Sequence, residues 1–392
     1  MAIVTAPSTA VSRTATGDGI VIGWESGGET FFHALWLADN CPEDGDRNKA
    51  FRTFSVVDLD TELTVADVRI AGALLEVTFS DADRSVFPVA WLHANRPDRR
   101  PDRPRKISTF RGDATLKEFT MPAKGSGTHC DLLEAVSEFG VAVVTGVPDG
   151  TSGTEALAAL IGRIRETDFG RIFDLIVEPD TWELSQTGLA LDPHTDDPFR
   201  YSPSGCSALR CISSTNTGGE SIIVDGFAVA EEMRALDPNG FDLLCTFAVP
   251  YIRHRNESVD QGEDVYMIAD APIIALDRDG ELAGIRFHER SMAPLDLGRE
   301  VIGDYYRAFI RFTKLMNDER FFLRRHLAAD EAIVFDNQRA LHGRTAFTGE
   351  GGGRYLQLFT VDRDQFHSRL RRLREDHGRA GVDERLTPGN LS

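Results

Sequence analysis

Short alternating runs of hydrophobic and polar residues dominate the first 94 residues of the chain. The runs are rich in Val, Ile, Thr and Phe, and turn-forming residues separate them. Their period is close to two, which is typical of half-buried β-strands. Five such runs occupy residues 19–25, 31–39, 51–59, 67–81 and 85–92. The pattern predicts a small β-rich N-terminal domain over residues 1–94.

A change in composition follows this region. Residues 96–106 (RPDRRPDRPRK) combine prolines with charged side chains, a composition typical of a stiff, solvated connection between folded parts. We therefore predict a Pro/Arg-rich linker over residues 95–112 and a second domain over residues 113–392. A chain of 392 residues is long enough for two domains, each with its own core.

Helical and strand-like patterns are interspersed in the second domain. Helices are predicted at 130–139, 153–167, 228–236 and 303–315. Strand-sized apolar runs occupy residues 140–147, 207–213, 220–227, 243–251, 271–277, 282–288, 332–337 and 354–361. So many short strands separated by loops predict a mostly β domain with flanking helices, either an antiparallel barrel or a double-sheet jelly roll.

Composition and charge narrow the possible partners. The chain has 43 basic and 62 acidic side chains, a net charge of −19, which argues against binding to nucleic acid or an anionic membrane. A small-molecule partner is therefore expected. The chain has no apolar run of membrane-spanning length and no signal-peptide pattern at its start, and its five cysteines form no Cys-x-x-Cys pair. We predict a cytoplasmic protein with reduced thiols.

Two short segments carry a possible metal-ligand set. His194 and Asp196 form a His-x-Asp pair, and on an extended segment their side chains point to the same side. Alone this pair is weak evidence, because a structural histidine beside an exposed aspartate arises often by chance. His342 follows the apolar run 332–337 and is placed to supply a third ligand. Two imidazoles and one carboxylate are typical of a non-haem Fe(II) site with an open face.

The same three ligands are compatible with more than one function. They can also hold zinc with an activated water, as in a zinc-dependent hydrolase. A third possibility is a catalytically silent ligand-binding protein on an oxygenase fold. Arg354 lies twelve residues after His342, and its planar guanidinium can hold a carboxylate through two hydrogen bonds. A keto acid that chelates iron at one end needs such a clamp at the other, and a hydrolase does not.

Several longer motifs resemble a known family. They are WLADN, HTDDP, TGGESIIVDGF, GIRFHERS and FDNQRALHGRTAF, the last followed by Arg354. Together they resemble the gamma-butyrobetaine and trimethyllysine hydroxylases of the taurine dioxygenase-like group, to which 2-trimethylaminoethylphosphonate hydroxylases are related. The resemblance runs from about residue 19 to residue 375.

The resemblance implies a fold, a reaction and roles for particular residues. It implies a double-stranded β-helix that binds Fe(II) through His194, Asp196 and His342. Arg354, helped by Ser221, would hold the distal carboxylate of 2-oxoglutarate. With O2 as the other co-substrate, the enzyme would hydroxylate an unactivated C–H and release succinate and CO2. The family also suggests a homodimer.

The chain departs from the family pattern in its N-terminal domain. Family members often carry zinc on three cysteines after the WL-x-DN motif and on a later histidine. Only Cys41 follows that motif here, and residues 79–87 contain no histidine. A single thiol does not make a zinc site, so we predict no structural zinc.

A second departure concerns the substrate. The butyrobetaine hydroxylases surround a trimethylammonium group with aromatic rings through cation–π attraction. The positions that correspond to this cage are Phe169, Phe173, Gln186, Asp197 and Thr360. Only two of these five residues, Phe169 and Phe173, are aromatic. Asp197 suits an ammonium group that still carries hydrogens.

Arginines and neighbouring polar residues complete the predicted substrate pocket. Arg286 and Arg290 are candidates for binding a carboxylate or phosphonate. Trp182, Glu183 and Arg200 are further pocket candidates. We expect a small zwitterionic substrate that resembles gamma-butyrobetaine or an aminoalkylphosphonate.

Overall fold

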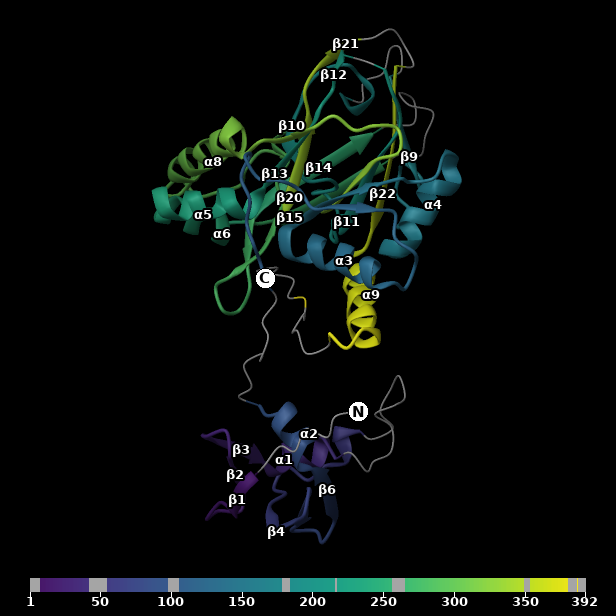
Figure 1. The fold of residues 1–392 in the computed structure, drawn as a ribbon. Coiled ribbons are helices and arrows are strands. Elements are labelled where there is room, and N and C mark those ends of the chain that lie inside the picture. Colours follow the sequence, from purple (N-terminus) through teal and green to yellow (C-terminus); the bar gives the residue numbers. More distant parts are fainter. Residues whose placement is uncertain are drawn as a thin grey trace. The chain divides into compact units, whose positions relative to one another are not determined.

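The chain forms two compact units in a computed structural model, Met1–Pro101 and Asp102–Ser392 (Figure 1). The structure describes residues 8–41, 55–97, 106–177, 184–215, 217–255, 265–348, 353–379 and 386. Within this part of the chain, no helix is long and apolar enough to cross a membrane.

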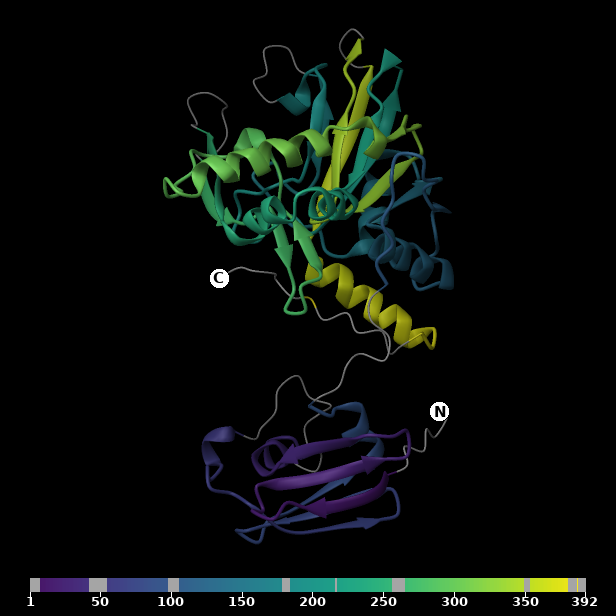
Figure 2. The ribbon, with the colours of Figure 1, turned by 90° about the vertical axis from the view of Figure 1, so that its left-hand side faces the viewer.

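The first unit contains two three-stranded antiparallel sheets (Figure 2). One is formed by β1 (Ser8–Arg13), β2 (Gly19–Trp24) and β3 (Glu29–His33), and the other by β4 (Val65–Ala71), β5 (Leu74–Phe79) and β6 (Arg84–Pro88). Side chains from both sheets, such as Ile20 and Phe87, are completely buried in one cluster. Burial of these apolar faces is what allows so small a unit to fold.

Two of the predicted strand runs in this unit are partly helical. The run 31–39 divides into β3 and the short helix α1 (Ala34–Asp39), and the run 85–92 divides into β6 and α2 (Val89–Ala94). The ring of His33 caps α1 by accepting a hydrogen bond from the Leu35 amide. In α1 the buried residues are Ala34, Leu37 and Ala38, a helical spacing that the alternating pattern before it obscured. Residues 51–54 of a third predicted run lie outside the described residues.

The second unit is built around two sheets. The larger has six strands in the order β7-β8-β19-β11-β22-β9, and the smaller has four in the order β10-β20-β13-β18. The six are β7 (Glu118–Thr120), β8 (Val141–Thr145), β19 (Ala332–Asp336), β11 (Cys206–Ser214), β22 (Arg354–Val361) and β9 (Phe173–Ile176). The four are β10 (Leu191–His194), β20 (Ala340–Arg344), β13 (Ser221–Asp225) and β18 (Leu323–Arg325). All of these pairs are antiparallel except β7 with β8.

Three short strand pairs complete the sheets of this unit. They are β12 (Thr217–Gly218) with β21 (Phe347–Thr348), β14 (Val249–Arg255) with β15 (Val265–Ala271), and β16 (Ile274–Leu276) with β17 (Leu282–Ile285). The prediction of a mostly β fold with helices is confirmed, and the two larger sheets are those of a jelly-roll core.

Helices flank the sheets in two groups (Figure 1). One group is α5 (Gly226–Leu236), α6 (Pro238–Thr246) and α8 (Ile302–Met316), whose buried faces meet in one core. The other is α3 (Gly127–Phe139), α4 (Gly150–Ile161) and α9 (Arg363–Asp376). Both groups cover apolar sheet faces that would otherwise be exposed to water.

Two helices differ from the sequence-based expectation. The run 243–251, predicted as a strand, ends α6 and then begins β14. Asp237 starts α6 by accepting a hydrogen bond from the Gly240 amide, and Pro238 favours the first turn. Helix α9 was not predicted from the sequence, because its many charged residues leave only Phe366, Leu370 and Leu373 as an apolar stripe.

Part of the segment predicted as a linker packs within the second unit. Phe110 is buried, and its amide donates to the Asp225 carboxylate at 3.0 Å. The Arg339 guanidinium, itself completely buried against Asp225, donates to the Ser108 carbonyl at 2.8 Å. These bonds fix residues 106–112 to the sheet that carries the candidate site.

Candidate metal and co-substrate site

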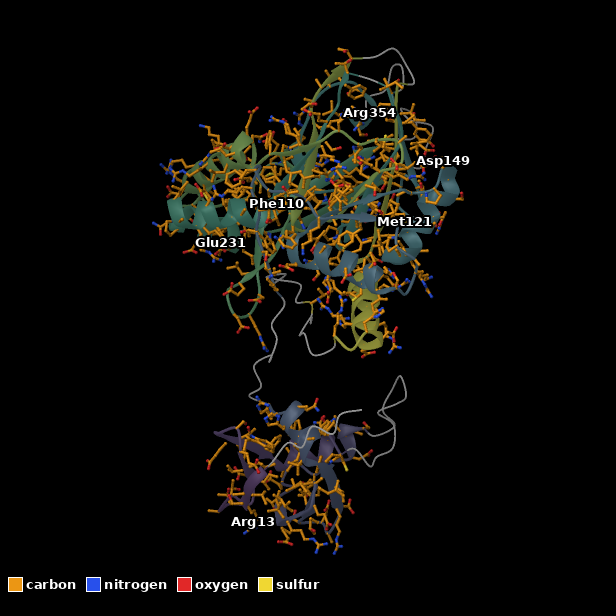
Figure 3. The ribbon with its side chains drawn as sticks, viewed as in Figure 1. Arg13, Phe110, Met121, Asp149, Glu231 and Arg354 are labelled. Atoms are coloured by element: carbon orange, nitrogen blue, oxygen red, sulfur yellow. The ribbon has the colours of Figure 1, made fainter. Side chains whose placement is uncertain are left out.

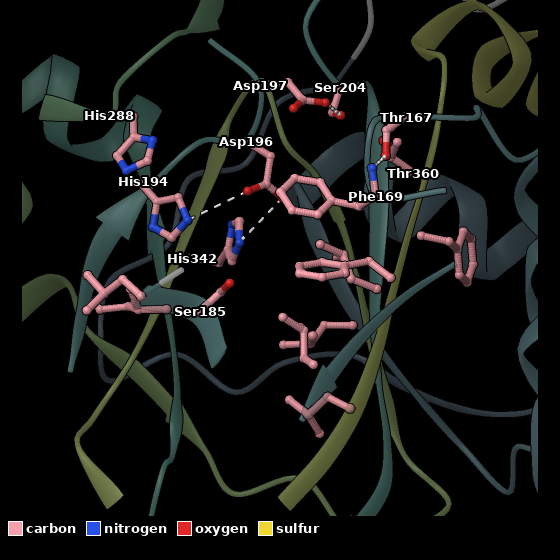
Figure 4. Close-up of a pocket in the computed structure, with 18 of the residues that line it drawn as sticks. Thr167, Phe169, Ser185, His194, Asp196, Asp197, Ser204, His288, His342 and Thr360 are labelled. Carbon is pink, nitrogen blue, oxygen red and sulfur yellow. Dashed lines mark hydrogen bonds and ion pairs between the residues drawn. The ribbon is translucent and has the colours of Figure 1, made fainter. Parts of the chain in front are cut away.

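Neighbouring strands bring the three predicted metal ligands together. β10 pairs with β20 so that His194 lies opposite His342, and Asp196 follows β10 by two residues. The His194 Nε2 and His342 Nε2 atoms each lie 3.6 Å from an oxygen of the Asp196 carboxylate (Figure 4). One ligand atom from each of the three lies within 4.8 Å of the others. The sequence separation of nearly 150 residues therefore closes to a single cluster.

The hydrogen bonds around the two imidazoles suit metal binding. His194 Nδ1 lies 2.9 Å from the Asp192 carbonyl. To donate to this carbonyl the ring must carry its proton on Nδ1, which leaves the Nε2 lone pair available for a metal. His342 Nδ1 is buried and has no hydrogen-bond partner among the described residues. Two nitrogen donors and one carboxylate with an open side fit a six-coordinate Fe(II) ion. The residues present therefore fit the iron that the sequence predicts.

The charge states of two of the three ligands agree with this fit, whereas the pKa of His194, which burial alone would lower, is raised by the Asp196 carboxylate. Burial lowers the pKa of His342 to about 4, so its imidazole is neutral near pH 7. Burial alone would raise the pKa of Asp196, but the His342 and His194 side chains hold it below its ordinary value. The cluster thus offers a carboxylate and a neutral imidazole, which are the forms that bind metal.

Asn337 holds the backbone of Asp196, the carboxylate of the candidate metal site. Its side-chain oxygen accepts from the Asp196 amide at 2.8 Å, and its Nδ2 donates to the Asp196 carbonyl at 3.1 Å. The same Nδ2 donates to the Ser204 carbonyl at 3.1 Å. Because Asn337 is completely buried between β19 and β20, it fixes Asp196 relative to the strand that carries His342.

Two arginines, Arg344 and Arg354, line the same cavity as the candidate metal ligands. Arg354 begins β22 (Figure 3), is 6% exposed, and has no carboxylate partner within the described residues. Arg344 lies two residues after His342 and donates to the backbone carbonyls of Leu184, Ser185, Thr187 and Leu189. A buried guanidinium without a counter-charge is costly. Arg354 is therefore ready for an anion, whereas Arg344 is engaged in holding the segment 184–189.

One cavity of about 400 Å³ contains the metal cluster and Arg354, a volume within the usual range for small-molecule sites. Most of the predicted site residues line it: His194, Asp196, His342, Arg354, Asp197, Phe169, Phe173, Arg290 and Thr360. Both sheets contribute to its walls, for example through Leu191 on β10 and Leu356 on β22. The cavity thus lies between the two sheets of the jelly roll.

Four predicted site residues are not among those that line this cavity: Ser221, Gln186, Arg286 and Arg200. Ser221 is buried in β13, in register with Arg344 on β20. Gln186 is half-buried in the short 3-10 helix Leu184–Gln186. A guanidinium nitrogen of Arg286 lies 3.4 Å from the Pro198 carbonyl. Trp182 and Glu183 lie outside the described residues.

Asp197 already interacts with polar groups of the protein. The Ser204 hydroxyl donates to its carboxylate at 2.7 Å, and Arg200 Nε lies 3.4 Å from the same oxygen. Burial and the neighbouring Asp196 charge raise the pKa of Asp197. Its backbone has φ 55°, in the left-handed region that few residues other than glycine, asparagine and aspartate adopt. The turn that follows Asp196 therefore depends on this residue type.

The structure adds residues that sequence reasoning missed. His288 is half-buried beside the His194 ring, with ring centroids 4.7 Å apart, and its Nδ1 lies 2.9 Å from the Ser291 hydroxyl. Its place in the GIRFHERS motif, one of those that resemble the family, could have marked it as a site residue. Arg344 could have been marked too, because residues two apart on a strand share a face. Arg253, on β14, lines the cavity although no local pattern marked it.

The fold and the site define a class of enzyme: an iron-dependent oxygenase that uses 2-oxoglutarate. The chain matches the family model of the taurine catabolism dioxygenase TauD, TfdA family over residues 121–360. It is 33% identical over 373 residues to a gamma-butyrobetaine dioxygenase from Pseudomonas sp. (strain AK-1), covering 93% of this chain and 96% of that protein. The chain therefore belongs to the TauD, TfdA family of dioxygenases.

Two further relatives have similar names. The human gamma-butyrobetaine dioxygenase is 27% identical over 366 residues, covering 90% of this chain and 93% of that protein. A mitochondrial trimethyllysine dioxygenase from Gallus gallus is 27% identical over 329 residues, covering 81% of this chain and 78% of that protein. The predicted enzyme class, a 2-oxoglutarate-dependent dioxygenase with Fe(II) as its metal, is confirmed, and the hydrolase alternative is set aside.

Proposed function

We propose that this dioxygenase hydroxylates an unactivated C–H of a small zwitterionic substrate that resembles gamma-butyrobetaine or an aminoalkylphosphonate. Succinate and CO2 would be released with each turnover. The observation that supports this most strongly is that the His-Asp-His cluster and the buried Arg354 line the same cavity. Relatives named gamma-butyrobetaine dioxygenase cover almost the whole chain.

The roles of the metal ligands follow from their geometry. His194, Asp196 and His342 would hold Fe(II), which when bound supplies the oxidation of substrate by O2 with 2-oxoglutarate as the second reductant. The protein's own part is to orient these side chains. Asp192 fixes the tautomer of His194, and Asn337 fixes the backbone of Asp196.

Arg354 is assigned to the distal carboxylate of 2-oxoglutarate. Its guanidinium is buried in the lining of the cavity, and a dicarboxylic keto acid would supply the missing counter-charge. Ser221 is assigned a supporting place behind this wall, because it is buried and lies beside Arg344 in the β13–β20 pair. Leucine side chains from β11 and β22 would exclude water from the bound co-substrate.

Asp197 is the candidate for the substrate's amino group. It lines the cavity beside Asp196, and its carboxylate is held in place by Ser204 and Arg200. An ammonium group with hydrogens can donate to a carboxylate, and a quaternary ammonium cannot. Phe169 and Phe173 supply apolar surface for the carbon chain, and Arg290 lies at the same cavity for the acid end.

Two further expectations accompany this proposal. All five cysteines are buried and free, which supports a reducing compartment such as the cytoplasm. The family resemblance supports a homodimer. Light scattering on the purified protein would measure its mass in solution, and a monomer would contradict that expectation.

A 2-oxoglutarate turnover screen tests the proposed function. Succinate is measured with Fe(II), O2 and each of a set of betaines, amino acids, aminophosphonates and sulfonates. We expect at least one zwitterion to raise succinate formation above the uncoupled rate and to gain one oxygen atom. If only compounds without an amino or acid group do so, the proposed substrate class is wrong.

A further inference from the structure

The ring of Phe169 is enclosed on both faces. The Phe173 ring lies 4.2 Å from it between centroids, at an interplanar angle of 31°. The Arg253 guanidinium carbon lies 4.6 Å from the Phe169 centroid. Two groups cannot stack on the same face at these distances, so one covers each face. Phe169 projects into the cavity toward the candidate metal ligands (Figure 4), but Phe173 and Arg253 already cover the two faces of its ring.

Arg253 is held firmly in this position. Its Nε donates to the Asp168 carboxylate at 3.0 Å, and the other oxygen of Asp168 pairs with Arg200 at 2.5 Å. The Phe199 ring also lies 5.8 Å from the guanidinium. Asp168 itself is 6% exposed. Stacking on aromatic rings and pairing with a buried carboxylate leave the guanidinium little freedom to move aside.

Arginines outnumber acidic residues among the side chains that line the cavity, and four of them also pair with carboxylates outside it. Six arginines but only two acidic side chains line it: Arg165, Arg171, Arg253, Arg290, Arg344 and Arg354 against Asp196 and Asp197. An Fe(II) ion and a doubly charged 2-oxoglutarate would cancel one another. Arg171 and Arg290 are more than half exposed and so are screened by water, whereas the Arg253 side chain is 16% exposed. Arg344 is more deeply buried and Arg253 pairs with Asp168, so Arg253 is distinguished by its position over the Phe169 ring in the same cavity.

We propose that Arg253 selects the substrate. Its guanidinium covers the face of the Phe169 ring that a quaternary ammonium group would need for a cation–π contact, and the same guanidinium binds the acid group of the substrate. The substrate is then a small amino acid or aminophosphonate whose amine still carries hydrogens. This inference rests on the proposed function of the same cavity. It assigns the acid end to a residue on β14, in place of the arginines near His288.

Binding constants test this without any need for turnover. The protein loaded with Fe(II) and 2-oxoglutarate is titrated anaerobically with 4-aminobutyrate, with 4-aminobutanamide, which lacks the acid, and with gamma-butyrobetaine, which adds three N-methyl groups. Wild type should bind 4-aminobutyrate more tightly than either. The Arg253→Ala variant should lose roughly tenfold to a hundredfold in affinity for 4-aminobutyrate, the range for a charged hydrogen bond, and should no longer distinguish acid from amide.

Other variants separate the two parts of the proposal. Arg253→Lys keeps a positive charge beside Asp168 and should retain part of the preference for the acid. Phe169→Leu should keep the full preference for acid over amide, because Arg253 remains. Arg311→Ala is the matched control. Arg311 is an exposed residue of α8 that pairs with Asp237, and its replacement should leave the three binding constants unchanged. Melting temperatures verify that each variant is folded.

Three results would overturn the inference. They are tighter binding of gamma-butyrobetaine than of 4-aminobutyrate by the wild type, an unchanged preference for acid over amide in Arg253→Ala, and no binding of 4-aminobutyrate to the wild type. If the turnover screen finds no zwitterion that stimulates succinate formation, the proposed function fails instead. A screen that succeeds with a quaternary betaine would preserve the proposed function and reject the role of Arg253.

Discussion

The side-chain amide of Asn337 forms hydrogen bonds with both backbone polar groups of Asp196, at 2.8 and 3.1 Å. Asn337 follows β19 directly, and His342 lies on the next strand, so this pair of bonds connects the metal-ligating carboxylate to the strand of another ligand. Metal affinity is sensitive to such supporting bonds, because ligand atoms must be placed accurately before the ion arrives.

Replacing Asn337 should therefore weaken metal binding. An Asn337→Asp variant keeps the acceptor for the Asp196 amide but loses both donated bonds and adds a charge next to two carbonyls. We expect a metal dissociation constant about 10- to 100-fold higher, measured by titrating metal-free protein with Co(II) or Fe(II). The control is Asn95→Asp, at an exposed helix end of the first unit. Unchanged affinity in Asn337→Asp would show that the hydrogen bonds are structural only.

Removal of a metal ligand should abolish the reaction. Alanine at His194 or Asp196 leaves two ligands for an ion that needs three, so substrate-dependent succinate should fall below detection and Co(II) binding should weaken. A chelator should inactivate the wild type reversibly, with activity restored by Fe(II). His254→Ala, at an exposed position of β14, is the control. Normal turnover in the His194→Ala or Asp196→Ala variant contradicts the metal assignment.

Arg354 should control the requirement for the co-substrate. Without its guanidinium the distal carboxylate of 2-oxoglutarate loses a charged hydrogen bond of about 1.5–3 kcal/mol. The KM for 2-oxoglutarate in Arg354→Gln should therefore rise roughly tenfold to a hundredfold, while the metal dissociation constant stays the same. Arg372→Gln, at an exposed position on α9, provides the comparison. A normal KM would mean that the clamp lies elsewhere.

Arg344 should act through the segment that it holds. Its guanidinium donates to four carbonyls between Leu184 and Leu189, and Leu184 and Ser185 line the cavity. Arg344→Ala should release these residues, which hydrogen exchange would detect as faster exchange in peptides that span 184–189. Exchange in β22 should not change. An unaltered rate at 184–189 would show that other contacts hold the segment.

His129 should make the second unit less stable in acid. Its Nδ1 accepts from the Gly125 amide at 3.0 Å and its Nε2 lies 2.7 Å from the Leu160 carbonyl, so the folded state holds a neutral ring. Burial lowers the pKa of His129 below 6.5. The unfolded state then binds the proton first, and the stability present above pH 6.5 is lost as the pH falls below it, by at most about 1.4 kcal/mol per pH unit.

A His129→Gln variant tests this contribution. Gln does not titrate, so the free energy of unfolding of the second unit, measured with urea between pH 7 and pH 5, should fall less steeply than in wild type. His254→Gln, at an exposed position, should keep the wild-type slope. If His129→Gln also keeps that slope, the protonation of His129 does not limit stability in acid.

Chemistry that depends on residue type could be predicted from the sequence. His194, Asp196 and His342 were predicted as iron ligands from the His-x-Asp spacing and the family motifs, and Arg354 because a keto acid needs a planar cationic partner. The mostly β fold followed from period-two runs such as 332–337 and 354–361. Where two periodicities met within one run, as at residues 31–39 and 243–251, the boundary between strand and helix was not visible.

Only the tertiary structure decided which side chains share the cavity. Ser221 and Arg286 have suitable chemistry and suitable motifs, yet neither lines it, whereas Arg253 and Asn337 reach the site from strands and turns far away in the sequence. Local patterns encode which face of a strand is buried, but not which distant strand lies opposite. The sequence by itself therefore determined the mostly β fold class and the enzyme class, and it singled out the candidate metal ligands and the candidate co-substrate clamp. The packing of β14 and the β19–β20 turn against them decided the surroundings of the substrate.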